Sequence, residues 1–210
     1  MRALLLALAL LALGVGCGGG DEQAAPTDGC ESVESPAPRE PGEREAPAEP
    51  LDSDATYALA FDTSCGSFMV ALDPELAPST AASLVELARD GYFDDTTFHR
   101  VVPGFVIQGG DPTQSGAGGP GYSTVDVPPS DARYVRGVVA MAKAGPEPPG
   151  TAGSQFFVVT GEDVGLPPEY AIVGRVTQGM DTVARIDALG VGDGPPGRPV
   201  VVERVTVDEG

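Results

Sequence analysis

From residue 57 onward the sequence is a series of short apolar runs separated by turns rich in glycine and proline. The eight runs occupy residues 57–61, 68–72, 97–101, 105–108, 137–142, 155–160, 171–176 and 200–207. Runs of this length, bounded by turn residues, are typical of β-strands and short for helices. This part of the chain is therefore expected to form a sheet of many strands.

Two segments between these runs have helical spacing instead. The first begins at Pro78 and ends before Gly91, and the second covers residues 180–189 and ends at Gly190. Proline at the start of a helix and glycine at its end are common helix boundaries. Because a closed barrel has no exposed sheet edges, we predict a mainly β domain over residues 57–210: a closed eight-stranded antiparallel β-barrel capped by two α-helices.

The start of the chain differs from everything that follows. Its apolar run has about a dozen residues, whereas a membrane-spanning helix needs about 20, so we expect residues 1–16 to be a secretory signal peptide. Cys17 follows small residues and resembles the lipobox of bacterial lipoproteins, in which the cysteine carries lipid. Lipidation would anchor the protein to a bacterial cell membrane on its extracytoplasmic side; the alternative is cleavage and release.

Residues 17–56 have the composition of a linker. The segment 18–56 contains six prolines, eleven acidic residues and two basic residues, and it has no aromatic residue. Such a segment cannot bury enough apolar surface to offset the entropy lost on ordering. We therefore predict a disordered, extended, acidic linker between the lipid anchor and the domain. A tail that binds a partner through its acidic residues is the alternative.

Three cysteines are present, at positions 17, 30 and 65. If Cys17 carries lipid, an even pair remains in an exported chain, where disulfides form. We predict a Cys30–Cys65 disulfide that fixes the linker to the domain, with two free thiols as the alternative. A closed loop of about 35 residues would contribute roughly 4 kcal/mol to stability on the chain-entropy estimate.

Composition excludes several classes of function. Acidic residues outnumber basic ones by 31 to 12, which gives a net charge of −19, and so acidic a surface does not bind nucleic acid. One histidine and three cysteines are too few for a zinc site, so no metal is expected. Ser154 lacks the glycine two positions later that a nucleophile elbow requires, which argues against a serine hydrolase.

One segment, residues 98–111, places a cation and an amide among apolar residues. Arg100 and Gln108 lie on two expected strands joined by the Pro103-Gly104 turn, so their side chains could share one face. A charge in apolar surroundings is costly unless it has a function or a partner. The residues alone leave two interpretations open: a functional site, or a structural Arg100–Asp111 ion pair.

Three blocks of sequence resemble the signatures of the cyclophilin-type peptidyl-prolyl cis-trans isomerases. They are residues 98–111, residues 137–146 with 153–157, and residues 170–174 with 179–180. The resemblance covers residues 57 to about 207. It implies an eight-stranded antiparallel barrel with two helices, isomerisation of X-Pro peptide bonds in exported proteins, proline-containing peptides as partners, and no cofactor.

The resemblance also implies roles for individual residues. Arg100 is expected to be the catalytic residue, which donates a hydrogen bond to the nitrogen of the twisted imide. Phe105, Val106, Phe157 and Leu166 are expected to hold the proline ring, Gln108 to hold the substrate backbone, Ala142 and Lys143 to line the peptide groove, and Tyr170 to close the pocket. Val106, Lys143 and Tyr170 stand where many family members have methionine, asparagine and histidine.

A second class of function remains open at this stage. A non-catalytic chaperone module could keep the groove and bind proline-containing peptides without turnover. Binding alone would not need a guanidinium at the imide nitrogen, so Arg100 favours the enzyme. A closed barrel on a flexible linker has no need of a second subunit, and we expect a monomer.

Overall fold

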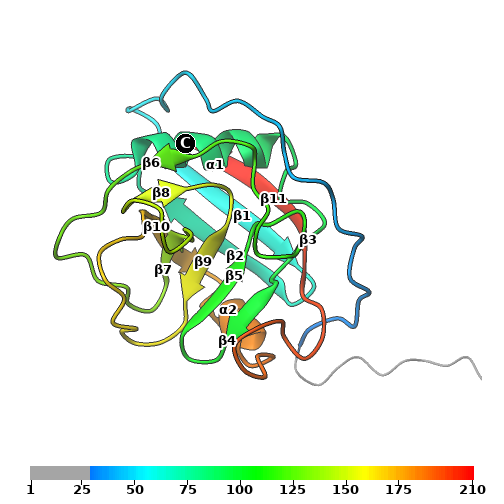
Figure 1. The fold of residues 1–210 in the computed structure, drawn as a ribbon. Helices are drawn as coiled ribbons and strands as arrows, with labels where there is room; N and C mark the ends of the chain where they lie inside the picture. The colour runs from blue at the N-terminus through cyan, green and yellow to red at the C-terminus, as the bar shows by residue number, and fades with distance from the viewer. Residues whose placement is uncertain (1–28) are drawn as a thin grey trace, which may run out of the picture.

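The computed structural model describes residues 29–210 as a curled β-sheet with a helix at each end (Figure 1). The strands are β1 Tyr57–Thr63, β2 Gly66–Leu72, β3 Thr96–Thr97, β4 Arg100–Val102, β5 Val106–Gly109, β6 Thr124–Val125, β7 Val138–Met141, β8 Thr151–Ala152, β9 Phe156–Val159, β10 Ile172–Gln178 and β11 Val201–Glu209, and the helices are α1 Pro78–Arg89 and α2 Met180–Asp187. Within these residues, neither helix is long and apolar enough to cross a membrane.

The main sheet has nine antiparallel strands in the order β3-β11-β1-β2-β10-β7-β9-β5-β4. It corrects the predicted closed eight-stranded barrel, because no ladder joins the end strands β3 and β4 in the described part of the chain. The expected strand 97–101 is interrupted at Phe98 and His99, which leaves two short end strands. Backbone groups here bond instead to irregular segments: Phe98 N–H, between the two end strands, donates to Val200 (3.1 Å), and Val101 N–H of β4 donates to Gly194 (2.8 Å).

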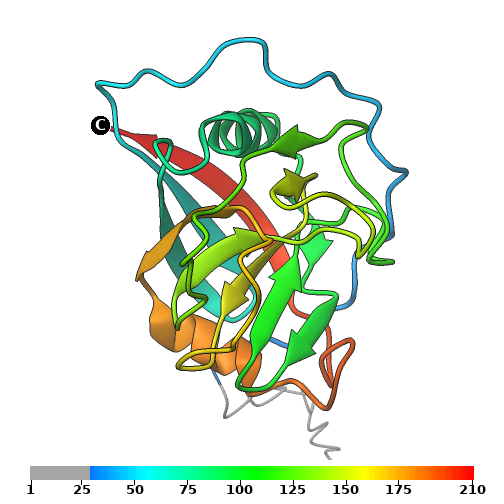
Figure 2. The same ribbon diagram turned by 60° about the vertical axis from the view of Figure 1, so that its left-hand side comes forward.

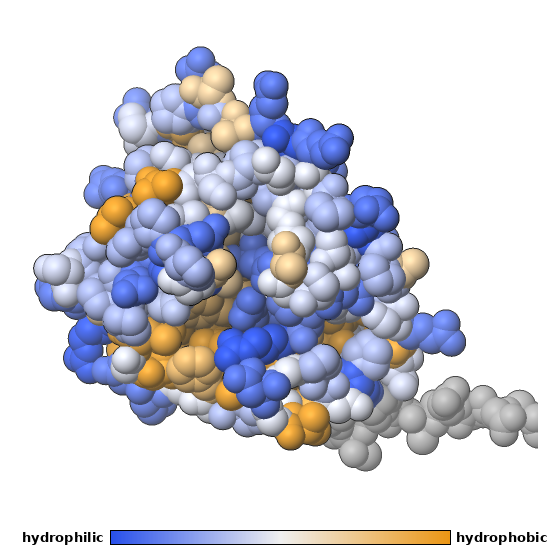
Figure 3. All heavy atoms as spheres, viewed as in Figure 1, coloured by the Kyte–Doolittle hydropathy of each residue, from blue (hydrophilic) through white to orange (hydrophobic). Residues whose placement is uncertain are grey.

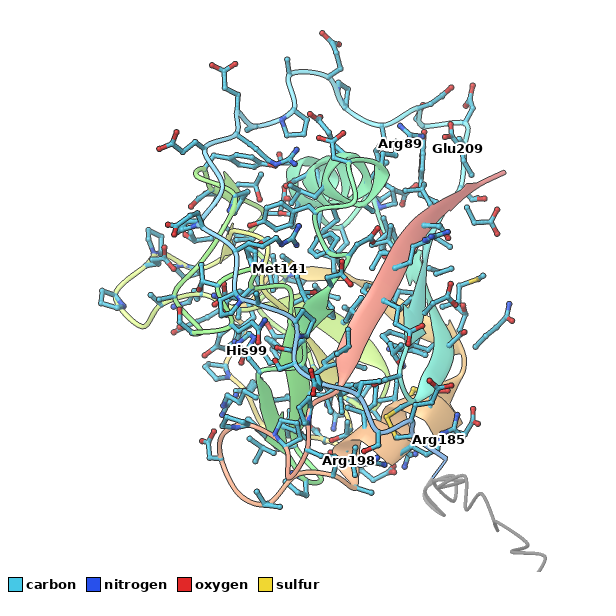
Figure 4. All side chains as sticks on the ribbon, turned by 90° about the vertical axis from the view of Figure 1, so that its right-hand side faces the viewer. Arg89, His99, Met141, Arg185, Arg198 and Glu209 are labelled. Carbon is cyan, nitrogen blue, oxygen red and sulfur yellow. A yellow bond between two sulfur atoms is a disulfide. The ribbon has the colours of Figure 1, made fainter. Side chains whose placement is uncertain are left out.

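The two predicted helices are present and cover opposite ends of the curled sheet (Figure 1). Helix α1 begins with Pro78, and no residue next to it caps the first turn. The carboxylate of Asp126 does so from a distant loop, accepting hydrogen bonds from the N–H groups of Ser79 (3.4 Å) and Thr80 (2.7 Å). At the other end of α1, Arg89 pairs with Glu209 of β11 (Figure 4), which fixes the helix to the sheet.

Strands β5, β7 and β9 have apolar residues on both faces. The inner face packs into the main core, where Phe156 contacts the rings of Phe61, Phe93 and Phe98. The outer face carries a second, smaller apolar cluster that includes Phe157. Phe156 and Phe157 therefore point to opposite faces of one strand, as the two-residue period of a strand requires. The candidate functional site described below lies on this outer apolar cluster.

Residues 29–56, here called the strap, lie along the domain from α2 to α1 and arch over α1 (Figure 2). The prediction of a disordered linker is therefore wrong for this part of the segment. The strap has no helix or strand of its own, but its backbone bonds to the domain, as in Arg39 N–H to Pro112 (2.9 Å), and Arg39 also donates to the carbonyls of Tyr92 (2.6 Å) and Asp94 (2.9 Å). Polar contacts hold much of the strap in place, and Cys30, Leu51 and Ala55 pack into or against the main core.

A disulfide between Cys30 and Cys65 joins the strap to the turn between β1 and β2, which confirms the predicted pairing. Both cysteines are buried, at 3% and 0% exposure. Arg185 and Arg198 lie near the disulfide in Figure 4 and donate to the carbonyls of Cys65 (3.1 Å) and Cys30 (3.3 Å). The strap is thus covalently fixed at its start. Cys17 and the signal segment 1–16 lie outside the described residues.

Candidate active site

One row of residues crosses four neighbouring strands on the outer face of the sheet. Arg100 of β4 is opposite Gln108 of β5, Gln108 is opposite Phe157 of β9, and Phe157 is opposite Ala140 of β7. Because residues paired across antiparallel strands point to the same face, the register places a cation, an amide and an aromatic ring side by side. The predicted shared face of Arg100 and Gln108 is confirmed.

Next to this row lies a cavity of about 270 Å³, here called the apolar pocket. It is lined by Arg100, Phe105, Val106, Gln108, Ala142, Lys143, Phe157, Leu166 and Tyr170. These are the nine residues that the sequence assigned to catalysis and substrate binding, and the structure brings all of them together. On the face shown in Figure 3, a hollow exposes apolar surface beside strongly hydrophilic side chains.

Arg100 is held from two sides at the edge of the apolar pocket. Its Nε and Nη2 donate to the carboxylate of Asp193 (2.5 and 3.1 Å), and its Nη1 donates to Oε1 of Gln108 (3.2 Å). The alternative of an Arg100–Asp111 ion pair is wrong. The Arg100 side chain keeps 32% of its surface exposed, so the guanidinium remains accessible from the pocket.

Gln108 connects Arg100 to the next residue along the groove. Its Nε2 donates to Oε1 of Gln155 (3.0 Å), while its own Oε1 accepts from Arg100. Both ends of the amide are therefore engaged within the protein. The predicted direct role of Gln108 in holding the substrate backbone is not tested, but these contacts make it a support for the guanidinium.

Phe157 and Tyr170 of the pocket lining form an aromatic cluster with a third ring, Tyr134. Tyr170 meets Phe157 edge to face at 5.6 Å between centroids and meets Tyr134 in the same way at 5.9 Å. Tyr134, which the sequence analysis missed, is buried, and its hydroxyl donates to the Tyr170 carbonyl (2.7 Å) and accepts from the Tyr170 N–H (3.0 Å). Tyr134 thereby fixes the backbone of Tyr170.

Lys143 lines the pocket with its ammonium 5.7 Å from the centre of the Tyr170 ring and paired within the protein. Its side chain is 3% exposed, its Nζ is 3.2 Å from the Glu169 carboxylate, and it donates to the carbonyl of Glu147 (3.1 Å). The ammonium is thus neutralised within the protein.

His99 precedes Arg100 in the sequence (Figure 4). Burial lowers the pKa of the His99 imidazole, which disfavours a second positive charge beside the Arg100 guanidinium.

Asp111 organises the loop that follows β5. The carboxylate is fully buried and accepts hydrogen bonds from Thr113 N–H (2.7 Å), Gly116 N–H (2.6 Å) and Gly118 N–H (3.2 Å). Burial alone would raise the pKa of Asp111, but these hydrogen bonds outweigh it and hold the pKa below its ordinary value. The ionised carboxylate is therefore the form that keeps the loop in shape.

Replacing Asp111 with asparagine is expected to destabilise the domain by roughly 2 kcal/mol at pH 7, because several buried hydrogen bonds to a charged acceptor are lost. A carboxylate whose pKa is lowered by folding stabilises the protein above its unfolded pKa of about 3.9, and that contribution is lost as the pH falls through the folded value. Urea unfolding of both proteins at pH 7 and pH 3 measures this. An equal stability difference at the two pH values contradicts the assignment.

Asp193, the partner of Arg100, was also missed by the sequence analysis. It lies in the loop between α2 and β11, flanked by Gly192 and Gly194, and it is separated from Arg100 by 93 residues. An acidic residue between two glycines marks an exposed loop, but nothing in the sequence links that loop to Arg100. Hydrogen bonding to Arg100 lowers the pKa of Asp193, so the pair is charged at neutral pH.

Asp193→Ala is expected to lower the catalytic efficiency of this site by about fivefold, because the guanidinium loses the partner that orients it. Asp193→Asn should recover part of the loss, since an amide oxygen can still accept one of the two bonds. The measurement is kcat and KM against pH for an Ala-Pro peptide, the type of substrate that the sequence resemblance implies. Wild type should lose its advantage over Asp193→Asn as the pH falls through the lowered pKa of Asp193; pH-independent, equal activities would show that Asp193 does not position Arg100.

The arrangement offers a hydrogen-bond donor beside an apolar hollow. None of the nine residues that line the apolar pocket is a serine, a threonine or a cysteine, and the only hydroxyl among them is the phenol of Tyr170. A guanidinium beside apolar surface instead stabilises a bound ligand when a lone pair on one of its atoms becomes available to accept a hydrogen bond.

Comparison with known proteins agrees with this geometry. Residues 58–207 match the family model described as cyclophilin type peptidyl-prolyl cis-trans isomerase/CLD. Peptidyl-prolyl cis-trans isomerase-like 1 of Gibberella zeae is 37% identical over 160 residues, which is 73% of this chain and 97% of the relative. The probable peptidyl-prolyl cis-trans isomerase A of Mycobacterium leprae is 37% identical over 177 residues, 75% of this chain and 94% of the relative.

The fold is also similar to that of a solved structure from the same family. The crystal structure of a cyclophilin type peptidyl-prolyl cis-trans isomerase from Cryptosporidium parvum, in the presence of the dipeptide Ala-Pro, aligns with a TM-score of 0.66 at 29% identity. The alignment covers 72% of this chain and 98% of that one.

Proposed function

This chain belongs to the cyclophilin-type peptidyl-prolyl cis-trans isomerase family and is an X-Pro isomerase, and we propose that it acts on exported proteins with Arg100 as its catalytic residue. The observation that carries the proposal is the position of the Arg100 guanidinium at the rim of the apolar pocket, between Asp193 and Gln108. The reaction explains why a donor is needed there.

Rotation about an X-Pro bond requires the amide to lose its resonance. The barrier is about 18–20 kcal/mol, and uncatalysed isomerisation takes tens of seconds or more. In the planar ground state the nitrogen lone pair is delocalised, whereas in the twisted transition state the nitrogen regains it. An enzyme therefore needs to break no bond, and it accelerates the reaction by binding the twisted imide more tightly than the planar one.

The residues of the apolar pocket meet this requirement. Phe105, Val106, Phe157 and Leu166 would seat the proline ring, and their apolar surface excludes water from the imide. The guanidinium of Arg100 would donate to the nitrogen lone pair that forms on twisting, and low local polarity strengthens that bond. Asp193 and Gln108 orient the donor before the substrate arrives, so little reorganisation is needed during the reaction.

We also propose that the protein is exported and anchored by lipid on Cys17, as a monomer on the extracytoplasmic side of a bacterial cell membrane. The signal-like segment 1–16 and the small residues before Cys17 support this. The Cys30–Cys65 disulfide supports it independently, because structural disulfides persist in oxidising compartments outside the cytoplasm. Proline-containing segments of other exported proteins would then be the substrates.

The anchor can be tested by expressing the full chain in bacteria with an alkyne-tagged fatty acid. Wild type should carry the label and fractionate with membranes, while Cys17→Ala should lose the label and leave the membrane fraction. An unlabelled wild-type protein, or a label that persists in Cys17→Ala, would overturn the anchor without affecting the isomerase activity.

A further inference from the structure

We propose that a second cavity beside the apolar pocket, here called the polar pocket, binds a long basic side chain of the substrate near its proline, and that the strap forms one of its walls. The inference rests on the proposed function, since it concerns how the same groove selects peptides. Neither the strap nor the charge that we assign to this cavity belongs to the motifs that identify the family.

The polar pocket adjoins the apolar pocket. It has a volume of about 800 Å³, and Gln108, Ala142 and Lys143 line both cavities. A peptide whose proline occupies the apolar pocket would therefore present a neighbouring side chain to the polar one. The volume is far larger than an alanine or serine needs, which favours a long side chain.

The charges around the polar pocket favour a basic ligand. Its lining contains two charged residues, Lys143 and Glu147. Lys143 is buried and pairs with Glu169, whereas Glu147 uses one oxygen to accept from the Ala144 N–H (2.6 Å) and has no cation within ion-pair distance in residues 29–210. The net charge of −19 adds a negative field over the whole molecule.

The rest of the lining combines polar backbone and amide groups with small apolar side chains. Residues 116–121 form a glycine-rich loop along one side, and Gln155 is fixed between this loop and the site because its Nε2 donates to the Gly118 carbonyl (2.9 Å). A guanidinium or ammonium can donate to such groups along its length while its charge meets the Glu147 carboxylate. An apolar side chain would leave them without partners.

The strap contributes Pro41 and Gly42 to the lining. It pairs with the glycine-rich loop through two backbone hydrogen bonds, Gly42 N–H to Gly119 (2.9 Å) and Arg44 N–H to Pro120 (2.8 Å). The fit is tight, because a Cβ on Gly42 would lie 2.8 Å from the carbonyl oxygen of Pro120. A side chain at position 42 would push the strap away from the loop and open this wall.

Further contacts hold the strap next to the pocket. Arg44 pairs with Asp90, and its guanidinium lies 5.4 Å from the centre of the Tyr92 ring. The disulfide at Cys30 fixes the strap closer to the N-terminus. The wall therefore belongs to the folded domain and does not depend on the substrate to form.

The test compares peptides that differ at one residue on either side of an Ala-Pro unit, with arginine, alanine or glutamate at that residue. Wild type at low ionic strength should isomerise the best arginine peptide with a kcat/KM about fivefold above that of the matching glutamate peptide. Salt should reduce the ratio, as for a partly exposed ion pair. Glu147→Gln, which keeps the acceptor for Ala144 but removes the charge, should lower the ratio to below about twofold.

Gly42→Ala tests the strap separately and should also lower the arginine-to-glutamate ratio. The matched control is Gly145→Ala, because a Cβ at that glycine would meet nothing within 4 Å, and it should keep the wild-type ratio. Equal rates for arginine and glutamate peptides, with the alanine peptide isomerised normally, overturn this inference and leave the isomerase intact. Failure to isomerise the alanine peptide would instead overturn the proposed function. A wild-type ratio in Gly42→Ala would remove the strap from the binding site.

Discussion

Replacing Arg100 with alanine is expected to lower kcat/KM for X-Pro isomerisation by about 100-fold or more. Removing one donor from a site that stabilises developing electron density costs about 10²–10³ in rate, and the apolar pocket contains no other free cation, because the charge of Lys143 is neutralised by Glu169. Arg100→Lys should recover little of the activity, since an ammonium cannot bond to Asp193 and Gln108 with the same planar geometry.

The measurement is the isomerisation rate of an Ala-Pro peptide by each purified variant. Loss of the Arg100–Asp193 pair should change stability little, because Asp193 is 67% exposed and exposed ion pairs contribute about 0–1 kcal/mol. Arg136→Ala is a suitable control, since Arg136 is paired with Glu162 but lies outside the pocket. Wild-type rates in Arg100→Ala would remove this residue from the mechanism.

Opening the Cys30–Cys65 disulfide is expected to cost about 4 kcal/mol of stability, because the bond closes a loop of 35 residues and so limits the unfolded chain. For a domain of this size the loss corresponds to a fall in Tm of about 10 °C. The effect should exceed that of any single strap contact, since the other contacts are hydrogen bonds and partly exposed ion pairs.

Thermal unfolding of wild type and of the Cys30→Ala/Cys65→Ala double variant, each with and without reductant, measures this contribution. Reductant should lower the Tm of wild type to near that of the double variant and leave the double variant unchanged. An unchanged wild-type Tm, with both thiols shown to be free by alkylation, would contradict the stabilising role of the disulfide.

Local rules predicted part of the apolar pocket, and the resemblance to the cyclophilin family supplied its other residues. Arg100 and Gln108 flank one turn, so strand pairing alone brings them together, and the alternation of Phe156 and Phe157 separates core from pocket. Both helices were predicted from their helical spacing and the glycine at each end, and α1 also from its first residue, Pro78. Strand ends were less predictable: the ladder of β6 with β8 has two residues in each strand, which is too short for a periodic pattern.

The order of the strap could not be predicted from its composition. Low apolar content indicates that a segment cannot build its own core, but it does not exclude binding to a neighbouring surface. Gly42 pairs with a glycine-rich loop more than 70 residues away, and Arg39 and Arg44 bond to groups near the end of α1. Such contacts depend on which surfaces the fold brings together.

Asp193 and Tyr134 were missed for the same reason. Asp193 reaches Arg100 from the loop after α2, and Tyr134 reaches Tyr170 across 36 residues. Each supports a predicted site residue through contacts between segments distant in sequence. The motifs therefore identified the residues that line the pocket, but not those that orient them.

The central claim is that Arg100 stabilises the twisted imide rather than the bound peptide. An NMR titration with an Ala-Pro peptide tests it most directly, because the titration gives Kd and exchange spectroscopy at saturation gives the cis-trans rate of the bound peptide. The account predicts that Arg100→Ala binds the peptide within about threefold of the wild-type Kd, since the apolar pocket remains, while the bound exchange rate falls by about 100-fold. An unchanged bound exchange rate with a much weaker Kd would contradict it.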